Sequence, residues 1–485
     1  MATESGRLLT ALDAWGGTPV LVVGDVMLDE WRFADAGRLS REAPAPVLTL
    51  RRRDQAAGGA GNAAANLAAL GARPALVAPL GDDDAADQVA ACLAGDGVTD
   101  RTIRVPDRGT PIKRRLLAGG QIVVREDEGD AGGPLPDGGA RRVIEALAAA
   151  DQPVLVVADY GLGALPEPVR RWLIAHRDRF GTVALDAHDL APWRDLAPTV
   201  LAPSIGEAAR ALARPAAKDA AGEYAAALRD RFGADVVAVT LDGDGAVVAS
   251  ADGVRRTRTA PAPEGHTVGA GDAYLAALTL ALATGAPVAV AADLAQAAAA
   301  VTVARTGTCV CDLAALRAAL TAEATIVDAD ALERVVRHRR AAGDRVVFTN
   351  GCFDVLHRGH VSYLRQAREL GDLLVVAVNS DASVRRLKGP DRPVVPAEDR
   401  VAVLAALSCV DHVVVFEEDS PAGLIERVRP DLYVKGGDYP PELVPEAAVV
   451  RRLGGEVRIL DYVPDRSTSA IIERIRAQPR SQPAR

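Results

Sequence analysis

The sequence predicts an α/β protein with two successive domains, each built on a largely parallel sheet. Short Val- and Leu-rich runs that end in a polar residue, such as "PVLVVGD", "PVLVVAD" and "TVALD", alternate with Ala-rich helical stretches. Buried parallel strands have this continuous apolar character, and the carboxyl ends of such strands carry the functional site. At 485 residues the chain exceeds one ordinary hydrophobic core. Two or three domains are therefore expected.

Charge and composition narrow the functional class. The formal net charge of −9 argues against a protein that binds duplex nucleic acid, although small phosphorylated ligands can still bind through local donors. The five cysteines are scattered and lack zinc-ribbon spacing, which favours a reduced protein. We find no apolar signal core at the N-terminus and no apolar run that could span a membrane. A soluble cytoplasmic protein is expected, without nucleic-acid or membrane partners.

The boundary between the domains follows from the order of the predicted elements. The first series of strands ends in an Ala-rich helical pair, roughly residues 271–320. The stretch "TIVDADALERVVRHRRAAG" predicts the first helix of the second domain, capped by Asp328 or Asp330. We place the domains at 1–322 and 323–476. The polar tail, 477–485, is predicted to be disordered.

A glycine-rich segment, "HTVGAGDAYLAALTLALATG", carries the chemistry of the first domain. Small residues at Gly269, Ala270 and Gly271 let backbone N–H groups approach an anion, and a helix that starts near Asp272 adds its positive dipole end. A carboxylate there can take a proton from a substrate hydroxyl during phosphoryl transfer. The loop is not a Walker A loop, because it has no Gly-Lys-Ser/Thr. By itself, the pattern favours the interpretation that Asp272 is only a helix cap.

Five further motifs precede this segment in order: "GDVMLDEW", "GGAGNAAANLAALG", "VADYGLGAL", "APSIGEAARAL" and "VTLDGDGAV". Together they resemble the ribokinase/PfkB family of sugar kinases over about residues 15–315. The resemblance implies a ribokinase-like fold, with Asp272 as catalytic base and residues 269–271 as the anion hole. The resemblance also implies a set of ATP-binding residues: Ser204, Glu207, Thr240, Asp242 and Gly245. The residues that it implies for the sugar hydroxyls are Asp29, Gly58, Gly59 and Asn62.

Three basic residues, Lys113, Arg115 and Arg125, are candidates for binding a substrate phosphate; a solvated basic strand is an equal alternative. Two positions depart from the family pattern in the surroundings of the base. His266 replaces the usual Asp and weakens the expectation of a monovalent cation. Ser204 replaces the Asn of an Asn-x-x-Glu motif that organises the Mg²⁺ and phosphate shell. Relatives also carry Asp-Pro-Lys where this chain has "LDAHD", so a Lys is missing near Ala187.

The second domain has two histidines in "FTNGCFDVLHRGHVSYLRQAR". A metal site would need a third ligand, and neither His338 nor His412 belongs to a metal-binding motif. A core role is disfavoured because Arg358 and Gly359 mark a turn. A strand precedes the turn and an amphipathic helix follows it, so His360 lies at the helix start, where anions bind. The pattern therefore predicts a phosphate site.

This stretch resembles the His-x-Gly-His signature of nucleotidylyltransferases of the cytidylyltransferase-like group, over about residues 343–475. The implied fold is Rossmann-like, and the implied reaction is attack of a sugar phosphate on the α-phosphorus of a nucleoside triphosphate. His357, His360 and Lys388 are the implied catalytic groups, acting with Mg²⁺ by positioning and charge stabilisation. The implied nucleotide contacts are Thr349, Asn350, Gly351, Phe353, Arg392, Ser467, Thr468 and Ser469. The implied sugar-phosphate contacts are Asp354, Lys435 and Asp438.

Two of these assignments have alternatives. Asp354 is also explained as a turn residue, and Cys352 is better explained as a small packing residue than as a nucleophile. No direct protein-only metal site is expected.

The order of the two halves resembles the family of bifunctional D-β-D-heptose 7-phosphate kinases / D-β-D-heptose 1-phosphate adenylyltransferases. The resemblance implies ATP as substrate in both reactions, heptose phosphates as acceptors, ADP-heptose as product and a homodimer formed through the kinase half. Two alternatives remain. In one, the first domain is a scaffold without kinase activity, as the changes at His266, Ser204 and Ala187 suggest. In the other, the enzyme acts on another sugar phosphate or nucleotide.

Overall fold

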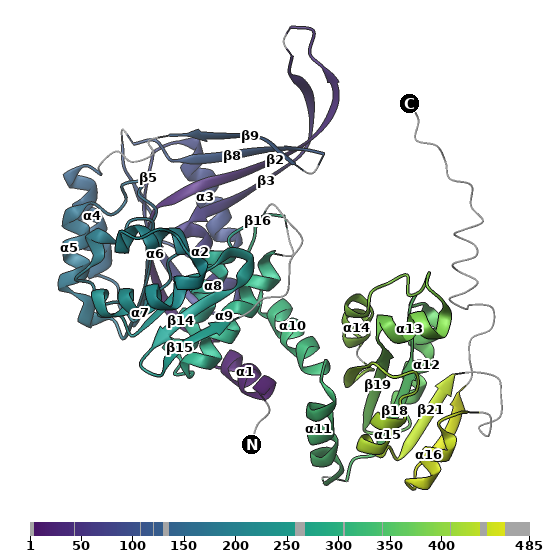
Figure 1. The fold of residues 1–485 in the computed structure, drawn as a ribbon. Coiled ribbons are helices and arrows are strands. Elements are labelled where there is room, and N and C mark those ends of the chain that lie inside the picture. The colour runs from purple at the N-terminus through teal and green to yellow at the C-terminus, as the bar shows by residue number, and fades with distance from the viewer. Residues whose placement is uncertain are drawn as a thin grey trace. The chain divides into compact units, whose positions relative to one another are not determined.

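The computed structural model describes residues 4–42, 44–106, 108–119, 121–129, 135–257, 267–303, 306–341, 343–407, 409–436 and 444–460. The chain divides into two compact units, Met1–Ala319 and Leu320–Arg485 (Figure 1). Both are α/β, as predicted. His266, Asp438, Ser467, Thr468, Ser469 and the tail 477–485 lie outside the described residues. None of the helices that the structure describes has the length and apolar character needed to cross a bilayer.

The first unit is built on a nine-stranded sheet in the order β15-β14-β13-β12-β11-β10-β1-β4-β6. Its strands are β1 (Pro19–Gly24), β4 (Arg73–Val77), β6 (Thr99–Asp100), β10 (Val154–Asp159), β11 (Thr182–Ala187), β12 (Val200–Leu201), β13 (Val236–Thr240), β14 (Ala246–Ser250) and β15 (Gly253–Thr257). Strands β6 to β13 in this order pair in parallel, and only β14 and β15 run antiparallel to their neighbours. The runs predicted as buried parallel strands are the adjacent strands β1, β10 and β11, which confirms that prediction.

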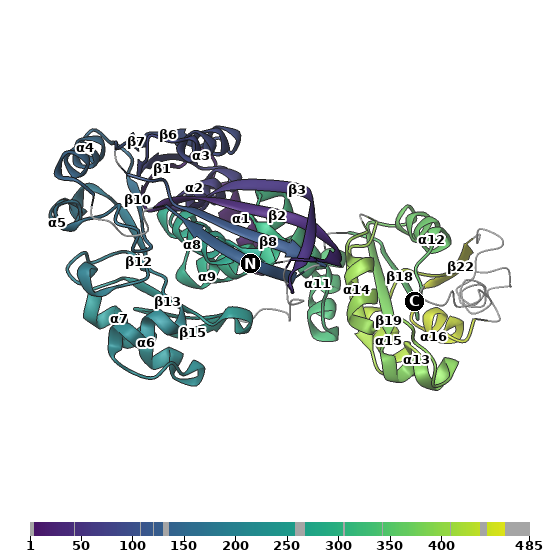
Figure 2. The same ribbon diagram turned by 90° about the horizontal axis from the view of Figure 1, so that it is seen from above.

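Helices cover both faces of this sheet. The helices of this unit are α1 (Glu4–Asp13), α2 (Ala60–Ala69), α3 (Asp84–Gly95), α4 (Asp137–Ala148), α5 (Glu167–Ala175), α6 (Ile205–Leu212), α7 (Ala221–Phe232), α8 (Ala270–Ala283) and α9 (Val288–Val303), with short 3₁₀ turns at Arg177–Arg179, Ala191–Trp193, Lys218–Ala220 and Asp242–Asp244. Helix α10 (Leu313–Thr325) runs across the boundary between the two units. Figure 2 shows α4 to α7 on one side of the strands and α8 and α9 on the other. This two-sided cover explains why the strands are apolar on both faces.

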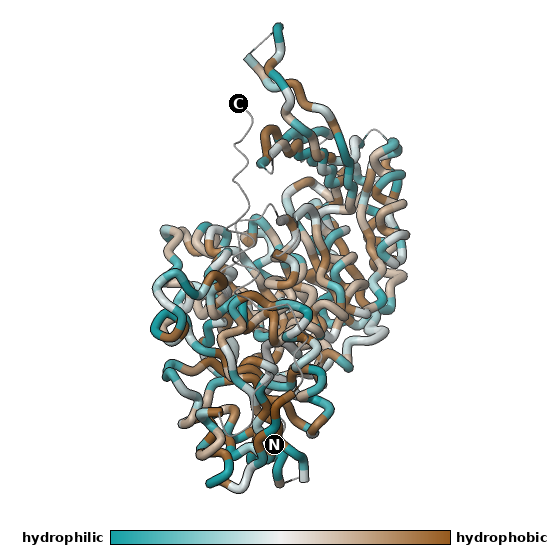
Figure 3. The backbone as a smooth tube through the Cα atoms, turned by 90° about the vertical axis from the view of Figure 1, so that its right-hand side faces the viewer, coloured by the Kyte–Doolittle hydropathy of each residue, from teal (hydrophilic) through white to brown (hydrophobic). Residues whose placement is uncertain are grey.

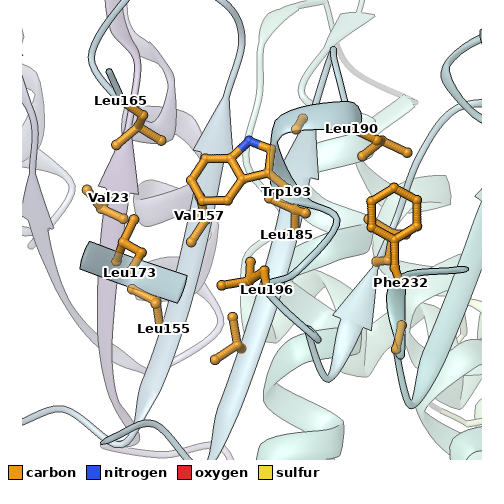
Figure 4. Packing of buried hydrophobic residues seen from close by; sticks show 14 of the residues in the cluster. Val23, Leu155, Val157, Leu165, Leu173, Leu185, Leu190, Trp193, Leu196 and Phe232 are labelled. Atoms are coloured by element: carbon orange, nitrogen blue, oxygen red, sulfur yellow. The ribbon is translucent and has the colours of Figure 1, made fainter. Parts of the chain in front are cut away.

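The core under α4 to α7 is filled by large side chains, shown in Figure 4. Leu155 and Val157 of β10 point into this layer, as the two-residue period of a strand requires. Trp193 is fully buried there, and its indole N–H donates to Asp159 Oδ2 at 2.8 Å. Burial of each such side chain stabilises the fold by about 1.5–3 kcal/mol.

A second sheet of the first unit has the order β3-β2-β8-β9. Its strands are β2 (Val26–Leu39), β3 (Pro46–Gly59), β8 (Ile112–Ala118) and β9 (Gln121–Glu128). Strands β2 and β3 extend as a long hairpin beyond β8 and β9, and apolar segments interrupt its polar ones (Figures 1 and 3). Two small ladders, β5 (Pro79–Leu80) with β7 (Ile103–Arg104) and β16 (Thr267–Val268) with β17 (Gly307–Thr308), complete this unit among the described residues.

The second unit has a parallel sheet in the order β20-β19-β18-β21-β22. The strands are β18 (Val346–Gly351), β19 (Leu373–Asn379), β20 (His412–Phe416), β21 (Leu432–Gly436) and β22 (Glu456–Leu460). The helices are α11 (Ala329–Ala341), α12 (Arg358–Arg368), α13 (Asp381–Lys388), α14 (Ala397–Ala405), α15 (Ala422–Val428) and α16 (Ala447–Arg452). The strand order reverses at β18, which places a crevice at its carboxyl end.

The predicted first helix of the second unit is α11. The Asp328 carboxylate caps this helix by accepting the Ala331 N–H at 2.6 Å. Of the two predicted caps, Asp328 is therefore the correct one. Asp330 lies in the first turn and pairs with Arg427 instead.

Candidate active sites

A cavity of about 210 Å³ lies in the first unit between the second sheet and the start of α8. Its walls include seven of the predicted residues: Asp29, Gly59, Lys113, Arg115, Gly269, Gly271 and Asp272. Parallel pairing of β2 with β8 sets Asp29 opposite Lys113 and Trp31 opposite Arg115. Because side chains alternate along a strand, these residues share the face that borders the cavity.

The turn before α8 requires glycine at position 269. Gly269 is the N-cap residue with φ 109°, and a Cβ there would lie 2.5 Å from Asn62 Nδ2 and 2.6 Å from the Cys309 carbonyl oxygen. Helix α8 begins at Ala270, so the first N–H groups of the helix have no intrahelical acceptor and can bind an anion. Among the described residues, the Asp272 carboxylate is hydrogen bonded to Asn62 and Tyr160 and not to this helix end, which favours a role other than capping.

Asp272 is held by two donors. Asn62 Nδ2 donates to Asp272 Oδ2 at 2.6 Å, and Tyr160 Oη lies 3.1 Å from Oδ1. Removal of the carboxyl from bulk water raises the pKa of Asp272 to about 6, although both hydrogen bonds act to lower it. A carboxylate with a pKa near neutrality is well suited to act as a general base.

The predicted sugar ligand Asp29 is also fixed by neighbours. Its Oδ1 accepts from Arg115 Nη1 at 2.9 Å, and its Oδ2 accepts from Thr308 Oγ1 at 2.9 Å. Gly58 leaves room for this carboxylate, since a Cβ there would lie 2.6 Å from Asp29 Oδ2. The Arg115 guanidinium also lies 4.9 Å from the Trp31 ring centroid. Asp29 and Arg115 therefore form a rigid polar wall at the cavity.

The three predicted phosphate-binding cations do not all reach this cavity. Lys113 and Arg115 border it. Arg125 is exposed on β9, outside the cavity wall, and makes two hydrogen bonds to Asp127 at 2.9 and 2.7 Å. Lys113 and Arg115 thus border the cavity, and Arg125 stands directly opposite Arg115 in the β8–β9 ladder, on the same face of the sheet.

The predicted ATP-binding residues of the first unit gather at the carboxyl ends of β12 and β13. Ser204 forms a capping box with Glu207, whose Oε2 accepts from both the N–H and the hydroxyl of Ser204 at 2.8 Å. Thr240 forms a bridge to Ser204, and Asp242 opens the following 3₁₀ turn. Gly245 ends that turn with φ 86°. Serine here replaces the Asn of relatives as a working helix cap.

Sequence reasoning missed four residues of this site: Asp25, Tyr160, Asp186 and Thr308. Asp25 accepts three backbone N–H groups, those of Tyr160, Leu162 and Ala164, at 2.8–3.0 Å. It therefore holds the turn that carries Tyr160. Three of them could have been found from their position in the sequence, because Asp25, Tyr160 and Asp186 all stand at the carboxyl ends of predicted strands.

In the second unit, the predicted strand, turn and helix form as expected. His357 is the N-cap of α12, and its Nδ1 accepts the Gly359 N–H at 3.1 Å. A neutral His357 therefore carries its proton on Nε2, where it can be donated to a phosphate. Both the helix start and the imidazole offer donors to one anion.

His360 lies beside His357 in the first turn of α12. The ring centroids are 4.0 Å apart, and the Phe353 ring is 5.5 Å from that of His360. Burial lowers the pKa of His360 to about 4, with His357 as a second cause. His360 is thus a neutral imidazole near pH 7, and its buried Nδ1 has no hydrogen-bond partner among the described residues.

The strand end beside these histidines is held rigidly. Asn350 Oδ1 accepts from Tyr433 Oη at 2.6 Å and from Lys435 Nζ at 2.9 Å. Burial lowers the pKa of Lys435. The Thr349 side chain is fully buried, and its hydroxyl is bonded to Tyr363. Thr349 therefore supports the strand through its side chain, whereas Lys435 lies at the crevice.

The loop after β18 is fixed by two buried charged side chains, Asp354 and Arg400. Asp354 accepts from the Val394 and Val395 N–H groups at 2.7 and 3.0 Å and pairs with Arg392. Arg400 is 1% exposed and donates to the carbonyl oxygens of Cys352 and Asn379 at 2.5 and 2.9 Å. Sequence reasoning missed Arg400. Both side chains join the His-x-Gly-His loop to the segment that follows α13.

These contacts bear on the two open assignments in this loop. Both oxygens of Asp354 are engaged, Oδ1 by the Val394 and Val395 N–H groups and Oδ2 by Arg392, which favours a positioning role over direct contact with the sugar phosphate. Burial raises the pKa of the Cys352 thiol, which favours packing over nucleophilic chemistry. Lys388 is the exposed last residue of α13.

Substitution of Asp354 with Ala is expected to destabilise the second unit by about 3–5 kcal/mol, because it leaves Arg392 without its buried partner. Hydrogen exchange of β18 and β19 peptides in urea measures this loss. The exposed neighbour Asp391, changed to Ala, is the control. Equal stability of the two variants would contradict the anchoring role of Asp354.

Comparison with known proteins matches each of the two units to a known family. The pfkB family carbohydrate kinase model matches residues 18–315, and the Cytidylyltransferase-like model matches residues 348–474. The phosphofructokinase-2 from Escherichia coli in complex with potassium covers 63% of this chain and 98% of its own, with 20% identity and a TM-score of 0.54. The ribokinase from Arabidopsis thaliana complexed with ribose and ATP covers 63% and 99%, with 21% identity and a TM-score of 0.50. At these identities the likeness shows the fold alone.

Two curated relatives match nearly the whole chain. The "Bifunctional protein HldE" of Halorhodospira halophila is 42% identical over 467 residues, which is 95% of this chain and 97% of that protein. The protein of the same name from Pseudomonas aeruginosa is 41% identical over 468 residues, 94% and 97%. The chain is thus a bifunctional enzyme with a carbohydrate kinase domain followed by a nucleotidyltransferase domain. It belongs to the family of HldE bifunctional proteins.

Proposed function

We propose that the first unit phosphorylates D-glycero-β-D-manno-heptose 7-phosphate at C1 with ATP. The observation that carries this proposal is Asp272, a carboxylate set beside the open N-terminus of α8. Asp272 removes the proton of the C1 hydroxyl as its oxygen attacks the γ-phosphorus of ATP. The N–H groups at the start of α8 hold the charge on the transferred group. Lys113 and Arg115 bind the 7-phosphate, and Asp29 orients the sugar hydroxyls.

The carboxylate of Glu207 is suited to bind Mg²⁺. One oxygen of this carboxylate, Oε2, is used by Ser204, whereas Nε2 of His188 and Nη2 of Arg210 lie 3.9 and 4.0 Å from the other oxygen, Oε1. Mg²⁺ favours one or two carboxylates together with substrate phosphates, which suits this arrangement. When bound, the ion would neutralise charge on the ATP phosphates.

The second unit then transfers AMP from ATP to heptose 1-phosphate and releases pyrophosphate, giving ADP-heptose. A phosphatase must act in between, because the kinase product carries two phosphates. The 1-phosphate oxygen is already ionised and needs no strong base. His357 and His360 donate to the phosphates at the start of α12, and Lys388 and Lys435 supply positive charge. The use of ATP in both reactions supports a cytoplasmic location.

Two assays test this proposal on the full chain. With ATP and heptose 7-phosphate we expect ADP, and with ATP and heptose 1-phosphate we expect pyrophosphate. Pyrophosphate alone would mean that the first unit is a scaffold without kinase activity. Turnover of a different sugar phosphate, with neither heptose phosphate accepted, would refute the proposed substrate.

We also propose that two chains associate through the second sheet of the kinase unit. Support comes from large apolar side chains exposed on its strands, namely Leu39, Leu50, Ile122, Val123 and Val124. Substitution of Val123 with Glu is expected to convert a dimer into a monomer, because it places a charge in an apolar contact. Light scattering after gel filtration measures the mass. Val254, exposed on β15, is the control position for the same substitution; an unchanged dimer in the Val123 variant would refute this interface.

A further inference from the structure

One phenol lies between two carboxyl groups at the wall of the kinase cavity. Tyr160 Oη is 2.9 Å from Asp186 Oδ2 and 3.1 Å from Asp272 Oδ1. Tyr160 follows β10, Asp186 belongs to β11 and Asp272 to the first turn of α8. Three separate segments therefore place a single hydroxyl within hydrogen-bond distance of two acids.

The number of protons at this contact follows from simple chemistry. A phenol has one hydrogen, so Tyr160 can donate to only one of the two carboxyl groups. If both acids were ionised, the carboxylate that receives no hydrogen from Tyr160 would face a lone pair of the Tyr160 hydroxyl oxygen at hydrogen-bond distance, and the two oxygens would repel each other. The second contact becomes favourable when that carboxyl carries a proton and donates it to Tyr160 Oη. Two like charges in one site also favour protonation of one acid.

The surroundings identify the acid that carries the proton. Asp272 has a second donor, Asn62, which stabilises its ionised form. Asp186 has Tyr160 as its only hydrogen-bonding partner among the side chains that the structure describes. In agreement, removal from bulk water and the nearby Asp272 raise the pKa of Asp186 to about 7, whereas that of Asp272 is raised to about 6.

We propose that Asp186 is a positioning residue for the kinase reaction: its carboxyl group stays protonated, donates to Tyr160 Oη and thereby directs the Tyr160 hydroxyl onto the catalytic base Asp272. The hydrogen bonds run in one direction, from Asp186 through Tyr160 to Asp272. This inference rests on the proposed role of Asp272 as base. In this proposal, Asp186 and Tyr160 act on the reaction through their hydrogen bonds to each other and to Asp272, and not by binding the substrate.

Other charged groups face this cluster from each neighbouring element. The charged and titratable groups that border the cavity are Asp29 on β2, Lys113 and Arg115 on β8 and His188 after β11. The charge of Glu207 on α6 acts on Asp186, and Asp25, which has Asp159 near it, accepts from the Tyr160 N–H. Neither Tyr160→Phe nor Asp186→Asn changes any of these residues. Differences between variants therefore report on the cluster itself.

The pH profile of kcat/KM for sugar phosphorylation tests the direction of these hydrogen bonds. The base acts in its ionised form, so the rate falls as the pH drops through the pKa of Asp272. Tyr160→Phe removes a donor to that ionised form, and we expect the acid limb to move up by about one pH unit. Asp186→Asn keeps a donor to Tyr160, and we expect its limb at the wild-type pH or below. An unmoved limb in Tyr160→Phe, or an upward shift in Asp186→Asn, would overturn the proposal.

A second experiment detects the proton on the Asp186 carboxyl group directly, without an activity measurement. Infrared titration should show one protonated carboxyl group that persists in the wild type at the pH where the rate has reached its plateau. Asp186→Asn should lack this signal, and circular dichroism checks that the variant is folded. Survival of the signal in Asp186→Asn would refute the assignment. If Asp272→Asn instead leaves phosphorylation intact, the proposed base is wrong, whatever the infrared result.

Discussion

Replacement of Asp272 with Asn is expected to lower kcat for sugar phosphorylation by about 10²–10⁴-fold, the usual contribution of a general base. Asn keeps the size of the side chain and can still pack against Asn62 and Tyr160, so the fold should be retained. The measurement is ADP release with saturating ATP and sugar phosphate. The loss should appear in kcat, because proton removal belongs to the transition state.

Two controls define this result. Adenylyl transfer by the same variant should be unchanged, since the second unit has its own site. Asp13→Asn, an exposed carboxylate paired with Arg317, should leave both reactions unchanged. A kinase rate within tenfold of the wild type would show that Asp272 is not the base. Loss of both reactions in a folded protein would show that the two sites are not independent.

Replacement of His360 with Ala is expected to have the opposite effect, a loss of about 10²–10³-fold in adenylyl transfer with phosphorylation retained. The reason is that His360 is neutral and half-buried beside His357, where a donor to the phosphates is most effective. Pyrophosphate release from ATP and heptose 1-phosphate measures the rate. His338→Ala, at an exposed position on α11, is the matched control. Equal rates in the two variants would remove His360 from the mechanism.

The pKa of His360 adds a pH test to the same variant. Because burial lowers this pKa to about 4, the imidazole stays neutral at any pH near 7. The wild-type rate of adenylyl transfer should therefore show no ionisation of His360 between about pH 6 and 8. A rate that depends on a cationic imidazole in that range would contradict the neutral-donor role.

Much of the fold was predictable because its signals are local. A strand that ends in Gly or Asp, a small-residue turn and an amphipathic helix are consecutive in the sequence, so the starts of α8 and α12 could be located closely. The same kind of local pattern limited the cap of α11 to Asp328 or Asp330, and the structure selects Asp328. Arg125 was harder, since its place depends on the course of β9 relative to the cavity.

The amino-acid sequence by itself determined the order of the two units, their α/β class, and the glycine-rich and His-x-Gly-His turns, since these depend on residues close together in the chain. Only the tertiary structure decided the partners of the reactive groups. Tyr160 meets Asp272, and Thr308 meets Asp29, across 112 and 279 positions of the chain. No local pattern encodes such contacts, because they arise only when the sheets and helices pack. The same packing removes these groups from water and so sets the pKa of the base.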